Sequence, residues 1–339
     1  MYVSTVPGNV KHFAGKDGQA ILWALNAKTG KTEWKWNEAP TRLWSKRNQS
    51  INGGSGQWYP PSFDAAGDVY LGTANPSPVP GTDAYPFGSS RPGPDLYTDS
   101  IVKLSHKTGK VEWYYQLTPH DIDDWDLQNS PILTTVGGKG VVIGAGKAGI
   151  VVEVDQKTGK LLWKTPVGLH NGHTHDGLLT LAQAKKTLKF PFTVYPGIFG
   201  GVESQMASDG TNVYAAVNNL GSTYSNNLET GIKTGNVFAG TGVVVALNQK
   251  TGKTVWVQNF AHSPYGGATV TNDVVFTTTF DGTIWALSAK TGQVLWQKQL
   301  PAGTNANVAV AGGFVITAAS LPLSQTQTPQ IIAYKLPQG

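Results

Sequence analysis

The chain has 339 residues, with 26 Lys and Arg against 21 Asp and Glu, for a formal net charge of +5. Charged residues make up 14% and hydrophobic residues 40%, with 41 Gly, 20 Pro and 11 Trp; this excludes a collagen-like or disordered chain and predicts many tight turns. Cys is absent, which excludes disulfides, Cys-ligated zinc, a Cys nucleophile and a CxxCH haem attachment site.

The order of apolar and basic residues narrows the class of protein further. No run of 18 apolar residues occurs, so no membrane span is predicted. The start, MYVSTVPGNVKHF, has no basic segment followed by an apolar one, so no signal peptide is visible in this chain. The basic residues are scattered singly, so nucleic-acid binding is not predicted.

Five segments share one pattern that ends in Trp. They are ILWALNAKTGKTEW ending at Trp34, SIVKLSHKTGKVEW at Trp113, IVVEVDQKTGKLLW at Trp163, VVVALNQKTGKTVW at Trp256 and TIWALSAKTGQVLW at Trp296. The alternating apolar residues predict a strand, and the Lys-Thr-Gly turn predicts a hairpin whose Gly takes a positive φ. A large flat ring is suited to packing one sheet against the next, so we interpret these Trp residues as structural.

Further hairpins precede several of these repeats, in DAAGDVYLGTAN, SDGTNVYAAVNN, TNDVVFTTTFDG and VAGGFVITAAS. Four strands per unit, repeated radially, predict an all-β fold, a β-propeller of four-stranded blades. The repeat Trp residues lie 79, 50, 93 and 40 residues apart, so the longer spacings predict insertions. Helical periodicity occurs only weakly, in TLAQAKKTL at residues 180–188.

About six units are recognisable, and the outer two are incomplete. The first lacks an opening strand before MYVST, and the last ends after IIAYKL without a TGKxxW hairpin. We expect residues 1–339 to form a single propeller domain, either a small propeller or a fragment of a larger one.

The segment TPHDIDDWDLQNSP departs from the repeat. Asp121, Asp123, Asp124 and Asp126 fall within six positions, and carboxylates this close repel one another unless a cation or hydrogen-bond donors neutralise them. Because alternate residues of an extended segment share a face, Asp124 and Asp126 could bind one hard cation such as Ca²⁺. The alternative is an acidic turn in which Asp side chains cap the backbone.

Two other segments contain candidate site residues. Gly53 and Gly54 allow close approach of the backbone to another group, Trp58 follows them, and Asn75 ends a strand within Asn-Pro-Ser-Pro. The alternative is an ordinary glycine turn, a core Trp and a turn-forming Asn. Lys147 lies inside the apolar hairpin VVIGAGKAGIVVEVD, where it either meets a buried partner or extends to solvent from a turn.

A cluster of imidazoles in GLHNGHTHDG offers a different hypothesis. His170, His173, His175 and Asp176 could ligate a transition metal, but the segment belongs to a long insertion with no fixed hairpin spacing. No GxSxG, P-loop or Rossmann glycine pattern is present.

Taken together, these motifs resemble those of the pyrroloquinoline-quinone (PQQ) propellers. TPHDIDDWDLQ resembles the His-Asp-x-x-Asp-aromatic-Asp segment of quinoprotein alcohol dehydrogenases, the methanol dehydrogenase relatives. GGSGQWYPPSFD followed by LGTANPSP is similar to their glycine-rich segment with Trp and the Gly-Asn-Pro after it, and GGATVTNDVVFTTTFDGTIWALSAKTGQVLW is similar to their penultimate blade. The similarity keeps one order across nearly all of the chain, whereas the family's propeller has eight blades.

The resemblance implies a PQQ- and metal-dependent alcohol dehydrogenase that oxidises an alcohol to an aldehyde. Trp58 would stack under the PQQ ring, beside Gly53 and Gly54 in the cofactor-binding segment. Lys147 would hydrogen-bond the quinone oxygens and stabilise charge on them as PQQ is reduced. The cofactor would carry the redox chemistry, and the protein would position it.

The resemblance also implies a metal site and a catalytic base. Asn75, Asp124 and Asp126 would ligate Ca²⁺ or a lanthanide ion, and Asp126 matches the acidic position that accompanies lanthanide sites in this family. Asp124 would take the alcohol hydroxyl proton as hydride passes to PQQ. The family's metal-binding Glu from an early blade and its disulfide of adjacent cysteines have no counterpart here, and Asp123 stands where many relatives carry an aromatic residue.

The implied partners are a small alcohol, a separate electron acceptor such as a cytochrome c, and a second chain or missing blades that complete the propeller. The implied location is the periplasm or the outside of the cell. The alternative is a non-catalytic PQQ-like propeller that serves as a scaffold or binding module.

Overall fold

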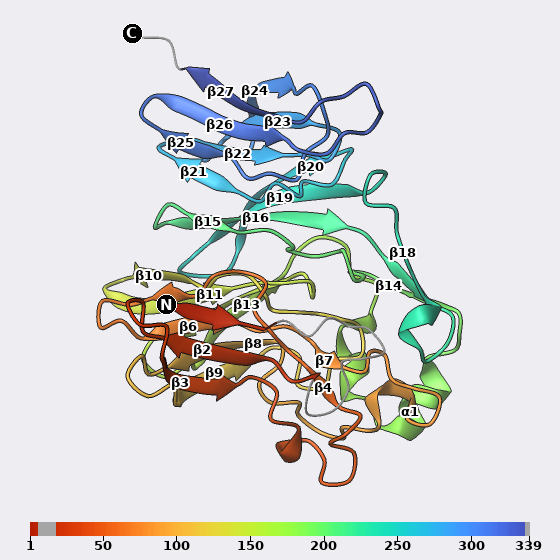
Figure 1. Ribbon diagram of the computed structural model, residues 1–339. Coiled ribbons are helices and arrows are strands. Elements are labelled where there is room, and N and C mark those ends of the chain that lie inside the picture. The colour runs from red at the N-terminus through yellow and green to blue at the C-terminus, as the bar shows by residue number, and fades with distance from the viewer. Residues whose placement is uncertain (6–17, 336–339) are drawn as a thin grey trace.

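Six antiparallel sheets follow one another in chain order in the computed structural model, which describes residues 1–5 and 18–335 (Figure 1). Four of them have four strands each, whereas the first and the last have three. This confirms the prediction of an all-β propeller of four-stranded blades with about six units and incomplete outer ones.

The strand bounds follow the predicted hairpins. The first blade contains β1 (Tyr2–Ser4), β2 (Ile21–Leu25) and β3 (Thr32–Asn37). The second contains β5 (Ser62–Phe63), β6 (Val69–Gly72), β8 (Ser100–Leu104) and β9 (Val111–Gln116). The third contains β10 (Ile132–Val136), β11 (Lys139–Gly144), β12 (Ile150–Asp155) and β13 (Leu161–Pro166).

The later blades are built in the same way. The fourth contains β15 (Ala207–Ser208), β16 (Asn212–Asn219), β19 (Thr241–Asn248) and β20 (Thr254–Phe260). The fifth contains β21 (Thr269–Thr271), β22 (Val274–Thr278), β23 (Thr283–Ser288) and β24 (Val294–Gln299). The sixth contains β25 (Ala309–Ala311), β26 (Phe314–Ala319) and β27 (Gln330–Lys335).

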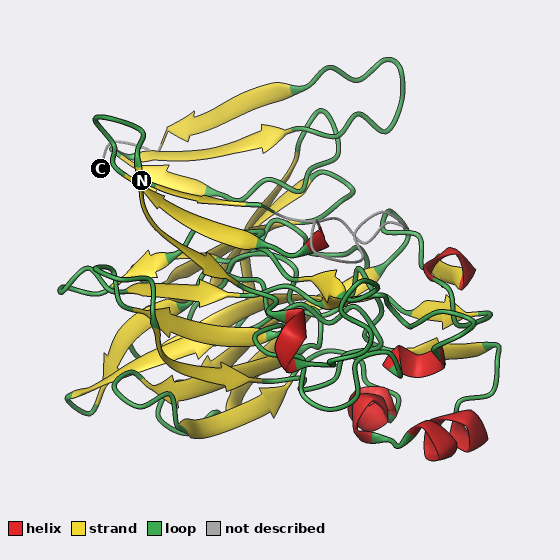
Figure 2. Ribbon diagram, turned by 60° about the horizontal axis from the view of Figure 1, so that its bottom comes forward, coloured by secondary structure: helices red, strands yellow, loops and turns green. Residues whose placement is uncertain are grey.

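Insertions between these strands account for the long Trp spacings. They contain the small sheets of β4 (Gly53–Gly54) with β7 (Pro76–Ser77), and of β14 (Phe192–Val194), β17 (Ser222–Tyr224) and β18 (Ile232–Thr234). The helix α1 (Leu181–Thr187) confirms the weak helical pattern, and Thr180 caps it. Short 3₁₀ helices span Thr41–Leu43, Pro86–Gly88, His173–Leu178 and Glu229–Gly231, and Figure 2 shows most of the helices to the right of the large sheets. None of the helices described is long and apolar enough to cross a membrane.

The repeat Trp residues join neighbouring blades. The Trp163 indole Nε1 donates to the carbonyl of Gln249 at 2.7 Å, and its ring covers Gly252, where an added Cβ would lie 2.6 Å from the ring. The same contact joins Trp34 to Gly109, Trp113 to Gly159, and Trp256 to Gly292. Trp296 is 39% exposed and packs edge-on against Tyr334, with ring centroids 5.4 Å apart.

The hydrophobic core consists mainly of five clusters, each lying between two neighbouring blades. Between the third and fourth blades, for example, Ile143 and Val151 pack against Val213, Val245 and Leu247. Burying a side chain of this size contributes about 1.5–3 kcal/mol, so the blades hold one another through their faces. The segments that enter each blade are thereby fixed in position.

Candidate functional site

A cavity of about 370 Å³ collects side chains from four blades. It is lined by Trp58, Tyr59, Asp126, Gln128, Lys147, Phe199, Glu203 and Tyr265. Tyr59, Gln128, Glu203 and Tyr265 lie three or four residues before the first strands of the second to fifth blades. The radial repeat therefore brings equivalent entry segments to one place. A larger cavity of about 430 Å³, near His262 and Asp281, lies on other strands.

Lys147 is the centre of charge in the smaller cavity. Its Nζ lies 2.8 Å from Oδ2 of Asp124 and 2.7 Å from Oδ2 of Asp126, and all three side chains are buried. The lysine thus has buried partners, as one of the two sequence interpretations expected. One ammonium serves two carboxylates, and removing it would leave two charges without compensation.

The protonation of this group follows from burial and charge. Burial raises the pKa of Asp124, the ammonium of Lys147 opposes that rise, and the carboxylate of Asp126 adds to it. Burial alone would lower the pKa of Lys147, but the two carboxylates raise it well above its ordinary value. Lys147 is therefore charged, and Asp124 is a carboxyl suited to taking up a proton near neutral pH.

Asn75 contacts the carboxylate of Asp126. Its backbone N–H donates to Oδ1 of Asp126 at 2.6 Å, and its side-chain amide donates to the carbonyl of Pro76 at 2.8 Å. Gly54 has a φ of +101°, and a Cβ there would lie 2.6 Å from the Asn75 carbonyl oxygen, so only glycine fits. The close approach that the glycines were expected to permit is thus made to the segment of Asn75; Gly53 and Gly54 do not line the cavity, and their cofactor-binding role stays a prediction.

The Asp-rich segment is shaped by its own first carboxylate. Asp121 accepts from the backbone N–H groups of Asp123 at 2.8 Å and Trp125 at 2.6 Å. Between them Asp124 has a φ of +62°, in the left-handed region that residues other than glycine rarely adopt. The alternative interpretation, an Asp that caps a turn, is therefore correct for Asp121. This turn directs Asp124 toward Lys147.

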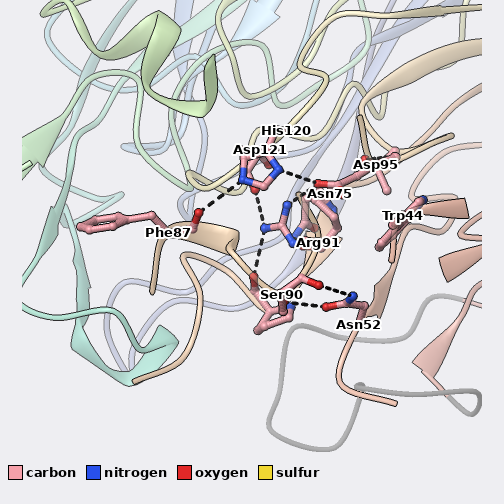
Figure 3. A network of polar contacts seen from close by, with 12 residues as sticks. Trp44, Asn52, Asn75, Phe87, Ser90, Arg91, Asp95, His120 and Asp121 are labelled. Atoms are coloured by element: carbon pink, nitrogen blue, oxygen red, sulfur yellow. Dashed lines mark hydrogen bonds and ion pairs between the residues drawn. The ribbon is translucent and has the colours of Figure 1, made fainter. Parts of the chain in front are cut away.

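A buried arginine holds this turn from behind (Figure 3). Arg91 donates through Nη2 to the carbonyls of Asp121 at 2.6 Å and Pro78 at 3.0 Å, and its Nη1 pairs with Asp95. His120 Nδ1 lies 3.4 Å from the same Asp95 carboxylate. The sequence prediction missed Arg91, because its segment reads as an ordinary Gly- and Pro-rich loop.

Two glutamates near the site were also missed. Glu38 is fully buried and accepts hydrogen bonds from Gln57 at 2.8 Å and Ser4 at 3.0 Å, next to the segment of Trp58. Burial raises its pKa to about 7. The sequence repeat contained a signal that could have identified Glu38. The residue four positions after the repeat Trp is apolar in the other units, and it is Glu only in the first. The other units have Leu117, Val167, Phe260 and Leu300 there.

Glu203 belongs to the cavity itself. Burial raises its pKa to about 8; Lys147 opposes this, whereas Asp126 and Asp124 add to it. The sequence signal that could have identified Glu203 is a Gly-Gly pair that recurs before several blades. Glu203 lies two residues after the pair Gly200–Gly201. Among the described residues that line the cavity with Lys147, only Asp126 and Glu203 have a carboxyl group.

The side chains present fit a flat molecule rich in oxygen. Trp58 is 53% exposed at the cavity and offers a ring face, and Lys147 supplies positive charge. Oε1 of Gln128 and Oε1 of Glu203 are buried there and have no hydrogen-bond partner in the part of the chain that the structure describes. Such atoms are expected to meet a bound molecule or water.

The predicted metal ligands form no metal site that the described residues show. Among residues 1–5 and 18–335 no group of three or more His, Cys, Asp or Glu side chains could hold a metal ion. Asn75, Asp124 and Asp126 supply hard oxygen donors, but both carboxylates contact Lys147, so their metal role stays a prediction. In the histidine-rich segment, His173 pairs with Asp176 at 2.6 Å and His170 contacts backbone carbonyls instead.

Comparison with known families divides the chain in two. The family described as the glucose/ethanol/alcohol dehydrogenase β-propeller domain matches residues 5–177, and the one described as outer membrane protein assembly factor BamB matches residues 200–334. The chain is 28% identical to a quinohemoprotein alcohol dehydrogenase of Comamonas testosteroni, over 84% of this chain and 47% of the relative. It is also 28% identical to a lanthanide-dependent methanol dehydrogenase of Methylacidiphilum fumariolicum, over 79% of this chain and 47% of the relative.

Solved structures show the same fold. A quinohemoprotein alcohol dehydrogenase of Pseudomonas putida superposes with a TM-score of 0.75 at 22% identity, covering 95% of this chain and 54% of that one. A europium-containing methanol dehydrogenase superposes with a TM-score of 0.72 at 22% identity, covering 89% of this chain and 62% of that one. The chain spans about half the length of the curated relatives it matches.

The alcohol dehydrogenase match covers half of the chain and includes every residue that the sequence predicted for the site, from Gly53 to Lys147. These features, the five inter-blade clusters, the Trp and Gly junctions and the buried charges, are thus those of one known family. The chain belongs to the family of PQQ-dependent alcohol dehydrogenases.

Proposed function

We propose that this chain carries the cofactor cavity of a PQQ-dependent alcohol dehydrogenase that oxidises a small alcohol to an aldehyde. One observation carries the proposal: Lys147 lines a cavity together with Asp126 and Trp58, and it also pairs with Asp124, which is buried directly behind the lining. Bound PQQ supplies the two-electron redox chemistry, which no side chain of this chain has. The protein supplies position and charge.

Each residue of the site has a separate role in this proposal. Asp124 takes the proton of the alcohol hydroxyl on its carboxylate, because burial raises its pKa toward neutral pH. Lys147 donates hydrogen bonds to cofactor oxygens, and Trp58 packs its ring against the flat face. Gly53 and Gly54 belong to the cofactor-binding segment.

A hard cation belongs to the proposal as well. Asn75, Asp124 and Asp126 would hold Ca²⁺ or a lanthanide ion through oxygen atoms, as such ions prefer. Lys147 would then turn from these carboxylates toward the cofactor. The contact of the Asn75 backbone with Asp126 supports this set, because it keeps the three residues together.

The surroundings of the enzyme are part of the same proposal. Residues 1–339 form one propeller domain, which further blades or a second chain complete, consistent with the share of the relatives that the chain spans. A separate acceptor such as a cytochrome c receives the electrons from the reduced cofactor. The expected location is the periplasm or the outside of the cell.

The first test is a titration of the purified chain with PQQ in Ca²⁺, in La³⁺ and in chelator, followed by Trp fluorescence. We expect saturable quenching that needs the metal and is at least ten-fold weaker in Asp124→Asn, because a metal ligand and its charge are weakened. Asp176→Asn is the matched control, since Asp176 is also buried and paired with a base, but that base is His173 and not the cavity residue Lys147. A dye-linked assay with alcohols then measures turnover, with a loss of about 10²–10⁴-fold expected in Asp124→Asn.

The second candidate is a non-catalytic propeller that serves as a scaffold or binding module. The match of residues 200–334 to the family of an assembly factor favours it. Absence of quenching with either ion, in a chain that is folded, would reject the dehydrogenase proposal and leave the scaffold.

A further inference from the structure

Glu203 is held in the cavity by two neighbours. Its Oε2 accepts from the side-chain amide of Gln128 at 3.1 Å, and its backbone carbonyl accepts from the hydroxyl of Tyr59 at 2.9 Å. The first contact orients the carboxyl and the second fixes the backbone. The side chain therefore has a defined direction at the cavity wall.

Its other oxygen, Oε1, is buried and receives no hydrogen bond from any described residue. A buried polar atom left in this way is unfavourable, and a cavity is where a ligand can satisfy it. We infer that Glu203 is a contact residue for bound PQQ, donating a hydrogen bond from a neutral carboxyl, at Oε1, to an oxygen of the cofactor. This inference rests on the proposed function.

The charges around Glu203 favour the neutral form. The Lys147 ammonium already contacts Asp124 and Asp126, so Glu203 would be the third carboxylate beside one cation. Burial raises the pKa of Glu203 to about 8, and those two aspartates add to the rise, while Lys147 opposes it. Because Oε2 accepts from Gln128, the proton belongs on Oε1, which then faces a cofactor whose carboxylate and quinone oxygens accept hydrogen bonds.

The remaining titratable groups at this wall are phenols. Burial raises the pKa of Tyr59 and of Tyr265 above their ordinary values, and in each case Glu203 adds to the effect. Both phenols are neutral across the pH range of interest. A change of PQQ affinity that requires Glu203 therefore reports its carboxyl.

The experiment measures PQQ affinity at pH 7 and pH 9 with saturating metal. In the wild type we expect affinity to fall about ten-fold between these values, because a carboxyl with a pKa of about 8 loses its proton there. Glu203→Gln keeps a donor without a titrating proton, so its affinity at pH 7 stays near the wild-type value and the ten-fold fall disappears. Glu203→Ala loses the hydrogen bond and binds about five-fold more weakly at pH 7.

Glu153→Gln is the matched control. Glu153 is buried in β12, burial raises its pKa to about 7, and it does not line the cavity, so this variant should keep the wild-type pH dependence. Equal pH dependence in the wild type and Glu203→Gln, with unchanged affinity in Glu203→Ala, would overturn the inference and leave the proposed function intact. A folded wild type that binds no PQQ at either pH would instead overturn the proposed function and this contact with it.

Discussion

The two parts of the chain that match different families share one blade architecture but differ in buried charge. Every buried charged residue of the described part of the chain lies from Glu38 to Asp176, whereas the one charged residue that the second part contributes to the cavity, Glu203, is partly exposed there. Both parts contain the same Trp and Gly junctions and the same apolar clusters between blades. Burying charge is costly, so its concentration in the first part agrees with the position of the site there, although Glu153 and Asp176 are buried outside the cavity.

Equivalent hairpins show how the difference arises. Between β11 and β12 the turn contains Lys147, which reaches Asp124 and Asp126 in the segment before its own blade. Between β22 and β23 the turn contains Asp281, whose carboxylate accepts from Thr279 and Thr283 of the same turn. The charged residue of the first hairpin thus binds another segment of the chain, whereas that of the second forms hydrogen bonds only within its own hairpin among the contacts described.

Removing the central cation should give the largest effect. Lys147→Met leaves Asp124 and Asp126 buried without compensation, so the free energy of unfolding at pH 7 should fall by about 3 kcal/mol. Urea denaturation measures this, and the loss should shrink at pH 4, where the Asp124 carboxyl, whose pKa burial raises, holds its proton. Lys103→Met is the control: Lys103 pairs with Asp68 at 3.1 Å and Glu112 at 2.9 Å, where solvent reaches the pairs, so about 1 kcal/mol is expected. Equal losses would mean that buried charge does not distinguish the site.

The junctions between blades should give an intermediate effect. Gly252 and Gly30 have φ values of +67° and +70°, but a Cβ at Gly252 would meet the Trp163 ring at 2.6 Å, whereas none of the described atoms lies within 4 Å at Gly30. Alanine at Gly30 should cost about 1 kcal/mol for the backbone, and at Gly252 about 2 kcal/mol more for the clash. Thermal or urea unfolding of the two variants measures the difference. Similar stabilities would show that the Trp contact does not hold the blades together.

The smallest effect concerns Glu38, which occupies a position that is apolar in the other repeats. Its pKa of about 7 in the folded chain exceeds the ordinary value of 4.5, so the folded state binds the proton more tightly and loses stability as pH rises through this range. Between pH 5.5 and 6.5 the stability of the wild type should fall by about 1 kcal/mol relative to Glu38→Gln. Parallel pH profiles of the free energy of unfolding would show that Glu38 is not protonated in the fold.

Several elements could be predicted from the sequence because their causes are local. Alternating apolar residues, the Lys-Thr-Gly turns and the Trp at the end of each repeat predicted the blades, and the incomplete outer units came out as three-stranded sheets. The same pattern identified Asp124, Asp126 and Lys147 as residues that break the repeat. It did not identify Arg91, whose segment has an ordinary composition, or Glu203, whose one signal is the Gly-Gly pair that precedes it.

The sequence by itself determined the blade, because strand period, turn glycine and packing ring are all set by neighbours in the chain. It also determined the family, through motifs that keep their order. Only the tertiary structure decided which charges meet, since Lys147, Asp126 and Glu203 come from segments that the radial repeat brings to one cavity. The protonation of these groups was decided there too, because burial and the distance between charges, which set a pKa, exist only after the blades have packed.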